Sequence, residues 1–160
     1  YLFPNQSKPL LVDPEAGLVS GGGALPSTRE IFLALTPAES LEWGVQPTLT
    51  VNADLGEVEG GYAALALAHG RELGGVEVEG TASLGVADAD YNAFYFGVDE
   101  TAMNDLTVGL TVAQGLNAEW TLSGGVEYTV LCDGAIRDAA DELYGHRDAW
   151  IFSGGLSGSF

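Results

Sequence analysis

The chain has 160 residues, enough for one domain of moderate size, and 46% of them are hydrophobic. Only 5 Lys and Arg residues oppose 23 Asp and Glu residues, which gives a formal net charge of -18. A polyanion of this kind repels phosphate backbones, so we expect no nucleic-acid partner. The hydrophobic content is too high for a disordered acidic tail.

The chain begins at Tyr1, in a stretch that looks like the end of a strand. We therefore expect residues 1–28 to be irregular, an outer loop or a strand end, and the chain to be a processed or truncated product. No run of about eighteen apolar residues occurs, so the sequence predicts neither a transmembrane helix nor a signal-peptide core.

Alternation of apolar and polar residues with a period of two predicts strands along the rest of the chain. Residues 29–160 are accordingly expected to form an antiparallel β-barrel wall of seven or eight visible strands, ending in strand 149–160. Five segments alternate clearly and two, 29–36 and 61–70, alternate weakly. The clear segments are 43–55, 76–86, 106–112, 120–130 and 150–160.

The connections between these segments differ in length and composition. Short ones at 36–40, 71–75 and 115–118 alternate with long acidic ones at 88–104 and 133–148, the pattern of periplasmic turns and extracellular loops in an outer-membrane barrel. No segment shows a sustained helical period, and the 23 glycines argue against helices. Trp43 is expected on the apolar face of its strand, and Pro47 is expected to cause a bulge.

The polar face of the strands indicates which side faces water. It carries Thr, Ser, Gly, Asn and Gln with a few carboxylates and no lysine, unlike the charged exterior of a soluble protein. A soluble ligand-binding barrel remains an alternative. The residues predicted to line a hydrated lumen are Gln46, Thr48, Thr50, Asn52, Asp54, Glu77, Glu79, Thr107, Thr111, Thr121, Glu127 and Thr129.

Aromatic residues fall near the two ends of the predicted strands. Trp43, Trp120 and Phe160 lie near the short turns, whereas Tyr128 and Trp150 lie near the long connections. Two aromatic belts are typical of a barrel that spans a bilayer. Such rings also dominate soluble cores, which is the alternative explanation.

Residues that could carry chemistry are few. Cys132 is the single cysteine and is interpreted as unreactive, and nothing in the sequence places a Ser beside His69 or His146. We therefore expect no enzymatic activity, no metal site and no cofactor. The acidic stretch DADYN has two alternate carboxylates but lacks the rest of an EF-hand loop, so solvated charge is favoured over weak binding of divalent cations.

The phrases PTLTVNADLGEVEGGYAALALAHGREL, DADYNAFYFGV and WIFSGGLSGSF resemble outer-membrane porins of the TorF-like kind, and more loosely the MipA/OmpV scaffolding barrels. The resemblance implies the C-terminal part of an up-and-down transmembrane barrel of about twelve strands. It also implies an integral protein of the bacterial outer membrane. Ser153, Gly155 and Phe160 look like the C-terminal signal that the outer-membrane insertion machinery reads.

Together these features predict a passive, cation-preferring diffusion channel whose partners are the lipid bilayer, the insertion machinery and small hydrophilic solutes or cations. The alternative is a scaffolding barrel that does not conduct and binds a periplasmic or surface partner.

Overall fold

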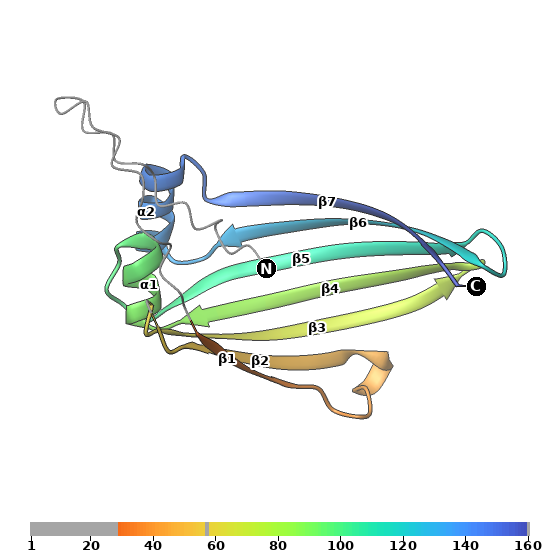
Figure 1. Ribbon diagram of the computed structural model, residues 1–160, viewed down its shortest axis with the longest axis horizontal. Helices are drawn as coiled ribbons and strands as arrows, with labels where there is room; N and C mark the ends of the chain where they lie inside the picture. Colours follow the sequence, from red (N-terminus) through yellow and green to blue (C-terminus); the bar gives the residue numbers. More distant parts are fainter. Residues whose placement is uncertain (1–28, 57, 160) are drawn as a thin grey trace.

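The computed structural model describes residues 29–56 and 58–159. Seven antiparallel strands form one sheet in the order β1-β2-β3-β4-β5-β6-β7, so the predicted all-β, up-and-down fold is confirmed (Figure 1). β1 and β7 are the two outer strands of this sheet. The strands are β1 (Glu30–Leu35), β2 (Gln46–Asp54), β3 (Gly61–Leu73), β4 (Val76–Ala87), β5 (Ala102–Gly115), β6 (Trp120–Leu131) and β7 (Asp148–Gly158).

The two ends of the sheet differ. At the hairpin end, short turns join β3 to β4 and β5 to β6, and residues 36–45 join β1 to β2, whereas α1 (Ala89–Phe96) and α2 (Gly134–Tyr144) gather at the opposite, cap end (Figure 1). The β3–β4 turn consists of Gly74 and Gly75, with φ of 63° and 85°. Positive φ at both positions is the type I′ hairpin turn, which glycine adopts without steric cost.

Cross-strand register gives the sheet one apolar and one polar face, because residues opposite each other in an antiparallel pair point to the same side. A row on one face is apolar from β1 to β6, whereas a row on the other face, from β2 to β7, consists of hydroxyl residues and alanines. The apolar row ends at an acidic residue and comprises Leu35, Leu49, Leu65, Leu84, Leu106, Val130 and Asp148. The polar row comprises Thr48, Ala66, Ser83, Thr107, Thr129 and Ala149.

The prediction that the long acidic connections lack helices is wrong. α1 begins after Asp88, whose carboxylate accepts the Tyr91 N–H at 2.9 Å, and ends at Gly97 in the left-handed conformation. α2 begins after Asp133, which accepts from the Ala135 and Ile136 N–H groups, and ends at Gly145, also left-handed. Both helices therefore carry the ordinary N-cap and C-cap residues, which outweigh the overall glycine content.

Two expectations for the segment 43–55 are also wrong. Trp43 lies in the short 3₁₀ turn Glu42–Gly44 before β2, with φ of 65°, so it is not a strand residue. Pro47 causes no bulge, because it pairs with Leu67 in continuous register. The Asp54 N–H points to the side of β3, and the Leu55 N–H points to the side of β1. Because successive backbone N–H groups of a strand point to opposite sides, the nitrogen of Pro47 faces β1. β1 pairing stops at Leu49, so no ladder bond is lost there.

Buried hydrophobic side chains gather at the cap end. Ile136, Ala140 and Tyr95 come from the two helices, and Ala87 and Val58 come from the adjoining strand end and connection. This small core fixes the helices over one end of the sheet. Residues 1–28 and Phe160 lie outside the described residues, so the predicted N-terminal irregular segment and the role of Phe160 stay predictions, as does the domain division at residue 29.

Candidate functional site

The polar face of the sheet is the candidate functional surface. All twelve residues predicted to line a lumen fall on this face. Each of them is opposite another residue of the set, or opposite a residue that lies on the same face of the neighbouring strand. Thr107 and Thr129 are opposite each other on β5 and β6, and their hydroxyl oxygens are 2.8 Å apart. The hydroxyl groups of neighbouring threonines are thus linked across the strands.

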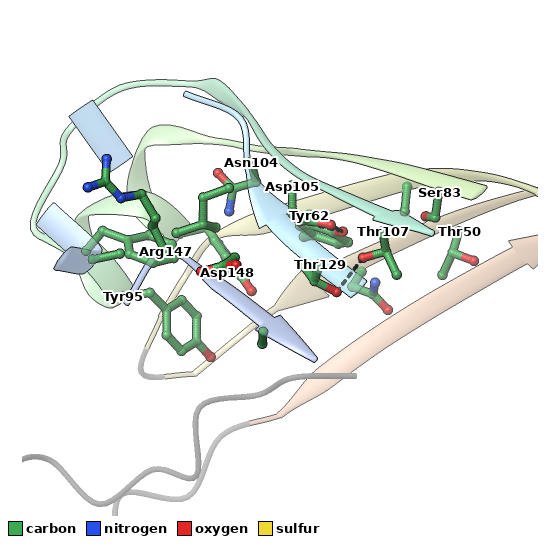
Figure 2. A pocket seen from close by; sticks show the side chains of 18 of the residues that line it. Thr50, Tyr62, Ser83, Tyr95, Asn104, Asp105, Thr107, Thr129, Arg147 and Asp148 are labelled. Carbon is green, nitrogen blue, oxygen red and sulfur yellow. Dashed lines mark hydrogen bonds between the residues drawn. The ribbon is translucent and has the colours of Figure 1, made fainter. Parts of the chain in front are cut away.

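The helices enclose the cap end of this face in a cavity of about 610 Å³. Its walls come from β1 to β7, from α1 and from α2, and they include Thr50, Asn52, Asp54, Thr107, Glu127 and Thr129 of the predicted set (Figure 2). Gln46, Thr48 and Thr121 lie on the polar face but do not line this cavity.

A tyrosine and an aspartate distant in sequence meet inside the cavity. The Tyr62 hydroxyl donates to both Asp105 carboxylate oxygens, at 3.2 and 3.0 Å (Figure 2). Leu84 pairs with Leu106 while Val86 pairs with Met103, so β5 holds one extra residue near Asp105, which is a β-bulge. Gly85 lies against this pair, and a Cβ there would approach an Asp105 carboxylate oxygen to 2.6 Å. Glycine at position 85 is therefore required for the pair to form.

The helices contribute a row of aromatic rings to the cavity. The rings of Tyr62 and Tyr91 have centroids 5.7 Å apart, and those of Tyr91 and Tyr95 are 4.5 Å apart. The Tyr144 hydroxyl donates to the Tyr95 carbonyl at 2.7 Å, which ties α2 to α1. Burial raises the pKa of Tyr91 well above its usual range, and Tyr95 and the charge of Asp105 raise it further, so this phenol stays neutral.

Asp54 and Asp88 have structural roles at the cap end. Asp54 accepts from the Gly56 N–H at 2.7 Å and the Val58 N–H at 3.3 Å, which fixes the β2–β3 connection. Asp88 accepts from the Gly61 N–H at 2.7 Å in addition to capping α1. Asp54, predicted to line the lumen, is therefore also a residue that shapes a turn.

A second group of carboxylates lies near the hairpin end. Glu77 is directly opposite Glu72, and Glu79 is opposite Thr111, all on the polar face. Together with Arg71 they border a smaller cavity of about 390 Å³. Sequence reasoning missed Glu72 because it ended the strand at Gly70. Extending the period-two alternation by two residues would have placed Glu72 beside Glu77.

Basic groups are scarce on the described part of this face. Arg147, in the cavity wall, pairs with Asp141 at 3.1 Å. His69 is on the apolar face near the hairpin end, whereas His146 follows α2, where its Nδ1 is 2.9 Å from the Tyr144 carbonyl oxygen. The two histidines are thus at opposite ends of the sheet, and the expectation that neither supports catalysis stays a prediction.

Residues 29–56 and 58–159 contain neither a cluster of metal-ligating side chains nor a helical membrane span. There, no three or more His, Cys, Asp or Glu side chains are grouped so that they could hold a metal ion. Cys132 is a free, partly exposed thiol. No helical segment in the same ranges has the length and apolar content that a membrane crossing requires.

Comparison with known protein families gives a match over most of the chain. The family model described as MltA-interacting protein MipA matches residues 27–157. Neither the curated proteins nor the solved structures include a match to the chain.

Proposed function

The chain belongs to the MltA-interacting protein MipA family, whose members are barrel-type proteins of the outer membrane, and from this premise we propose that it forms part of the wall of a porin-like channel. In this proposal the polar face lines a passive, cation-preferring path for small hydrophilic solutes, as in the TorF-like porins that the sequence resembles. The apolar face contacts the lipid bilayer of the bacterial outer membrane.

The observation that carries the proposal is the distribution of exposed apolar side chains over the sheet. Val108, Leu110 and Phe152 are 43%, 46% and 77% exposed, and they belong to the face opposite the helices and cavities. A water-soluble protein rarely exposes so continuous an apolar surface, whereas a lipid-facing barrel wall requires one.

The dimensions of the sheet support the same placement. β2 to β7 have 9 to 14 residues each, and a tilted strand needs roughly 9–11 to cross a bilayer. Trp120 lies at the hairpin end, whereas the rings of Tyr128 and Trp150 have centroids 4.6 Å apart toward the cap end. Amphipathic rings at both ends are suited to the two membrane interfaces.

Cation preference follows from the charges on the polar face. Glu72, Glu77 and Glu79 lie near the hairpin end, and Asp105 and Glu127 lie near the cap end. Carboxylates that line a pore concentrate cations and repel anions.

The test is an ion-selectivity measurement on the protein reconstituted in planar bilayers. We expect permeability to K⁺ to exceed that to Cl⁻, and the preference to shrink as the Debye length falls from about 10 Å at 0.1 M salt to about 3 Å at 1 M. The double variant Glu77→Gln/Glu79→Gln should reduce the preference. Glu142→Gln, on the exposed surface of α2, is the matched control and should change it less. Anion preference would contradict the assignment of the two faces.

A scaffolding barrel is the second candidate, favoured by the family description, which names an interaction with MltA. Such a barrel would insert into the membrane without conducting and would bind a periplasmic or surface protein through its turns or helices. Protein that is inserted but gives no conductance would favour this candidate over the channel. Recognition of Ser153, Gly155 and Phe160 by the insertion machinery, and the lack of enzymatic activity, stay parts of the proposal.

A further inference from the structure

Two linked side chains and an adjoining turn lie at the hairpin end, on or beside the apolar face. The Arg71 Nε donates to His69 Nε2 at 3.0 Å, and His69 Nδ1 is 3.3 Å from the Gly44 carbonyl oxygen. Because Nε2 accepts from a guanidinium, the proton of the neutral ring is on Nδ1, which donates to Gly44. His69 therefore connects Arg71 on β3 to the turn that carries Trp43.

The turn holds the Trp43 side chain away from the protein. Trp43 has a left-handed backbone, and the Gly44 N–H donates to the Leu41 carbonyl at 3.1 Å while the Leu41 N–H donates to the Val45 carbonyl at 2.8 Å. The Trp43 side chain is 84% exposed. An indole kept exposed in a closed turn is suited to the boundary between lipid tails and headgroups.

Arg71 is an exception to the chemistry of its face. It is opposite Val78, and the same row continues through Val112, so the register places it on the apolar face, two residues from the end of β3. Its side chain also borders the smaller cavity, together with Glu72, Glu77 and Glu79. It is the only Lys or Arg on the apolar face of the described strands. In the part of the chain that the structure describes, its Nη atoms make no hydrogen bond and no ion pair.

We propose that Trp43, His69 and Arg71 form a binding site for the phosphate of a phospholipid headgroup, in the leaflet that meets the hairpin end. The inference rests on the membrane placement of the proposed function. His69 holds the Arg71 Nε, which leaves the two Nη groups to donate to phosphate oxygens in a forked geometry. Because Arg71 is the only Lys or Arg on the apolar face of the described strands, an anionic headgroup finds a cationic partner on that face at this rim, although Glu72, Glu77 and Glu79 border the adjoining cavity.

The test uses Trp43 as a local reporter in full-length protein refolded into vesicles. Trp120 and Trp150 are replaced by Phe, so that Trp43 is the single tryptophan of the three. Brominated phosphatidylglycerol or brominated phosphatidylcholine is then titrated into the bilayer, and quenching of Trp43 fluorescence gives the relative affinity for each lipid. We expect a preference for the phosphatidylglycerol of about fivefold, equivalent to ~1 kcal/mol for one cation near an anionic headgroup.

Three variants separate the parts of the site. Arg71→Gln should abolish the preference, and Arg71→Lys should retain only part of it, because Lys keeps the charge but loses the Nε donor and the fork. Arg147→Gln, which removes the same charge at the cap end, is the matched control and should leave the preference unchanged.

The outcomes distinguish this inference from the proposed function. Heat-modifiable gel mobility shows whether the protein is inserted. If the inserted protein has the same lipid preference with and without Arg71, the phosphate site is wrong and the proposed function is unaffected. A chain that does not insert overturns both. An Arg71→Gln variant that changes the oligomeric state without changing the quenching would identify the rim as an interface between copies, and the lipid proposal would be wrong.

Discussion

The cap end and the strand wall of this molecule are stabilised in different ways. At the cap end, Ile136 is fully buried and Asn92, also fully buried, donates from its amide to the carbonyls of Glu100 and Ala87. In the wall, Leu84, Val108 and Leu110 are between 36% and 46% exposed. The cap thus has a small core of its own, whereas the wall presents its apolar side chains to its surroundings. In the proposed function, the lipid bilayer covers these exposed wall residues.

The largest expected effect comes from a charge placed in the core of the cap. Ile136→Asp puts an unpaired carboxylate among Tyr95, Ala140 and neighbouring side chains, and should cost about 4 kcal/mol in local stability. Hydrogen exchange of the α2 amides should accelerate accordingly. Ala135→Asp places the same residue one position earlier, where the side chain is exposed, and should have little effect. If exchange in the strands rose as much as in α2, the two regions would not be independent.

A smaller effect should separate the two faces of the wall. Val108→Arg places a cation on the apolar face near the middle of β5, and should cost ~3 kcal/mol in a bilayer. Thr107→Arg places the same cation one residue earlier, on the polar face near Glu127, and should reduce the free energy of unfolding by less. Urea unfolding in vesicles, followed by heat-modifiable mobility, measures both. Equal losses for the two variants would contradict the assignment of the apolar face to lipid.

The smallest effect concerns Cys132, at the boundary between the wall and the cap. Burial, followed by the charge of Asp105, raises the pKa of this thiol, while Arg137 lowers it. The thiolate fraction at pH 8 should therefore be smaller than for an unhindered cysteine, and alkylation should rise with pH later than in a reference peptide. Arg137→Gln should slow alkylation at pH 8 a further few-fold. Asp138→Asn, on the exposed side of α2, is the control, and an unchanged rate in Arg137→Gln would remove the electrostatic explanation.

The two faces of the sheet were predictable from the sequence because alternation is local. Every second side chain of a strand points to the same side, so Thr48, Thr50 and Asn52 were assigned together without knowledge of their neighbours. The capping residues of the two helices are also a local sequence signal, but the sequence prediction did not use them. Asp88 and Asp133 precede the helices, and Gly97 and Gly145 follow them, a signal that was available but outweighed by the count of glycines.

The interior of the cap could not be predicted from the sequence. Tyr62 and Asp105 are 43 residues apart, and they meet only because β3, β4 and β5 are adjacent and β5 carries an extra residue at the bulge. Likewise, Arg71 and Gly44 are joined through His69 by the pairing of β2 with β3. Period two determined which side each strand residue faces, because that depends on the backbone of one strand. Which residues meet depended on register and connection geometry, which arise only when separate strands pair.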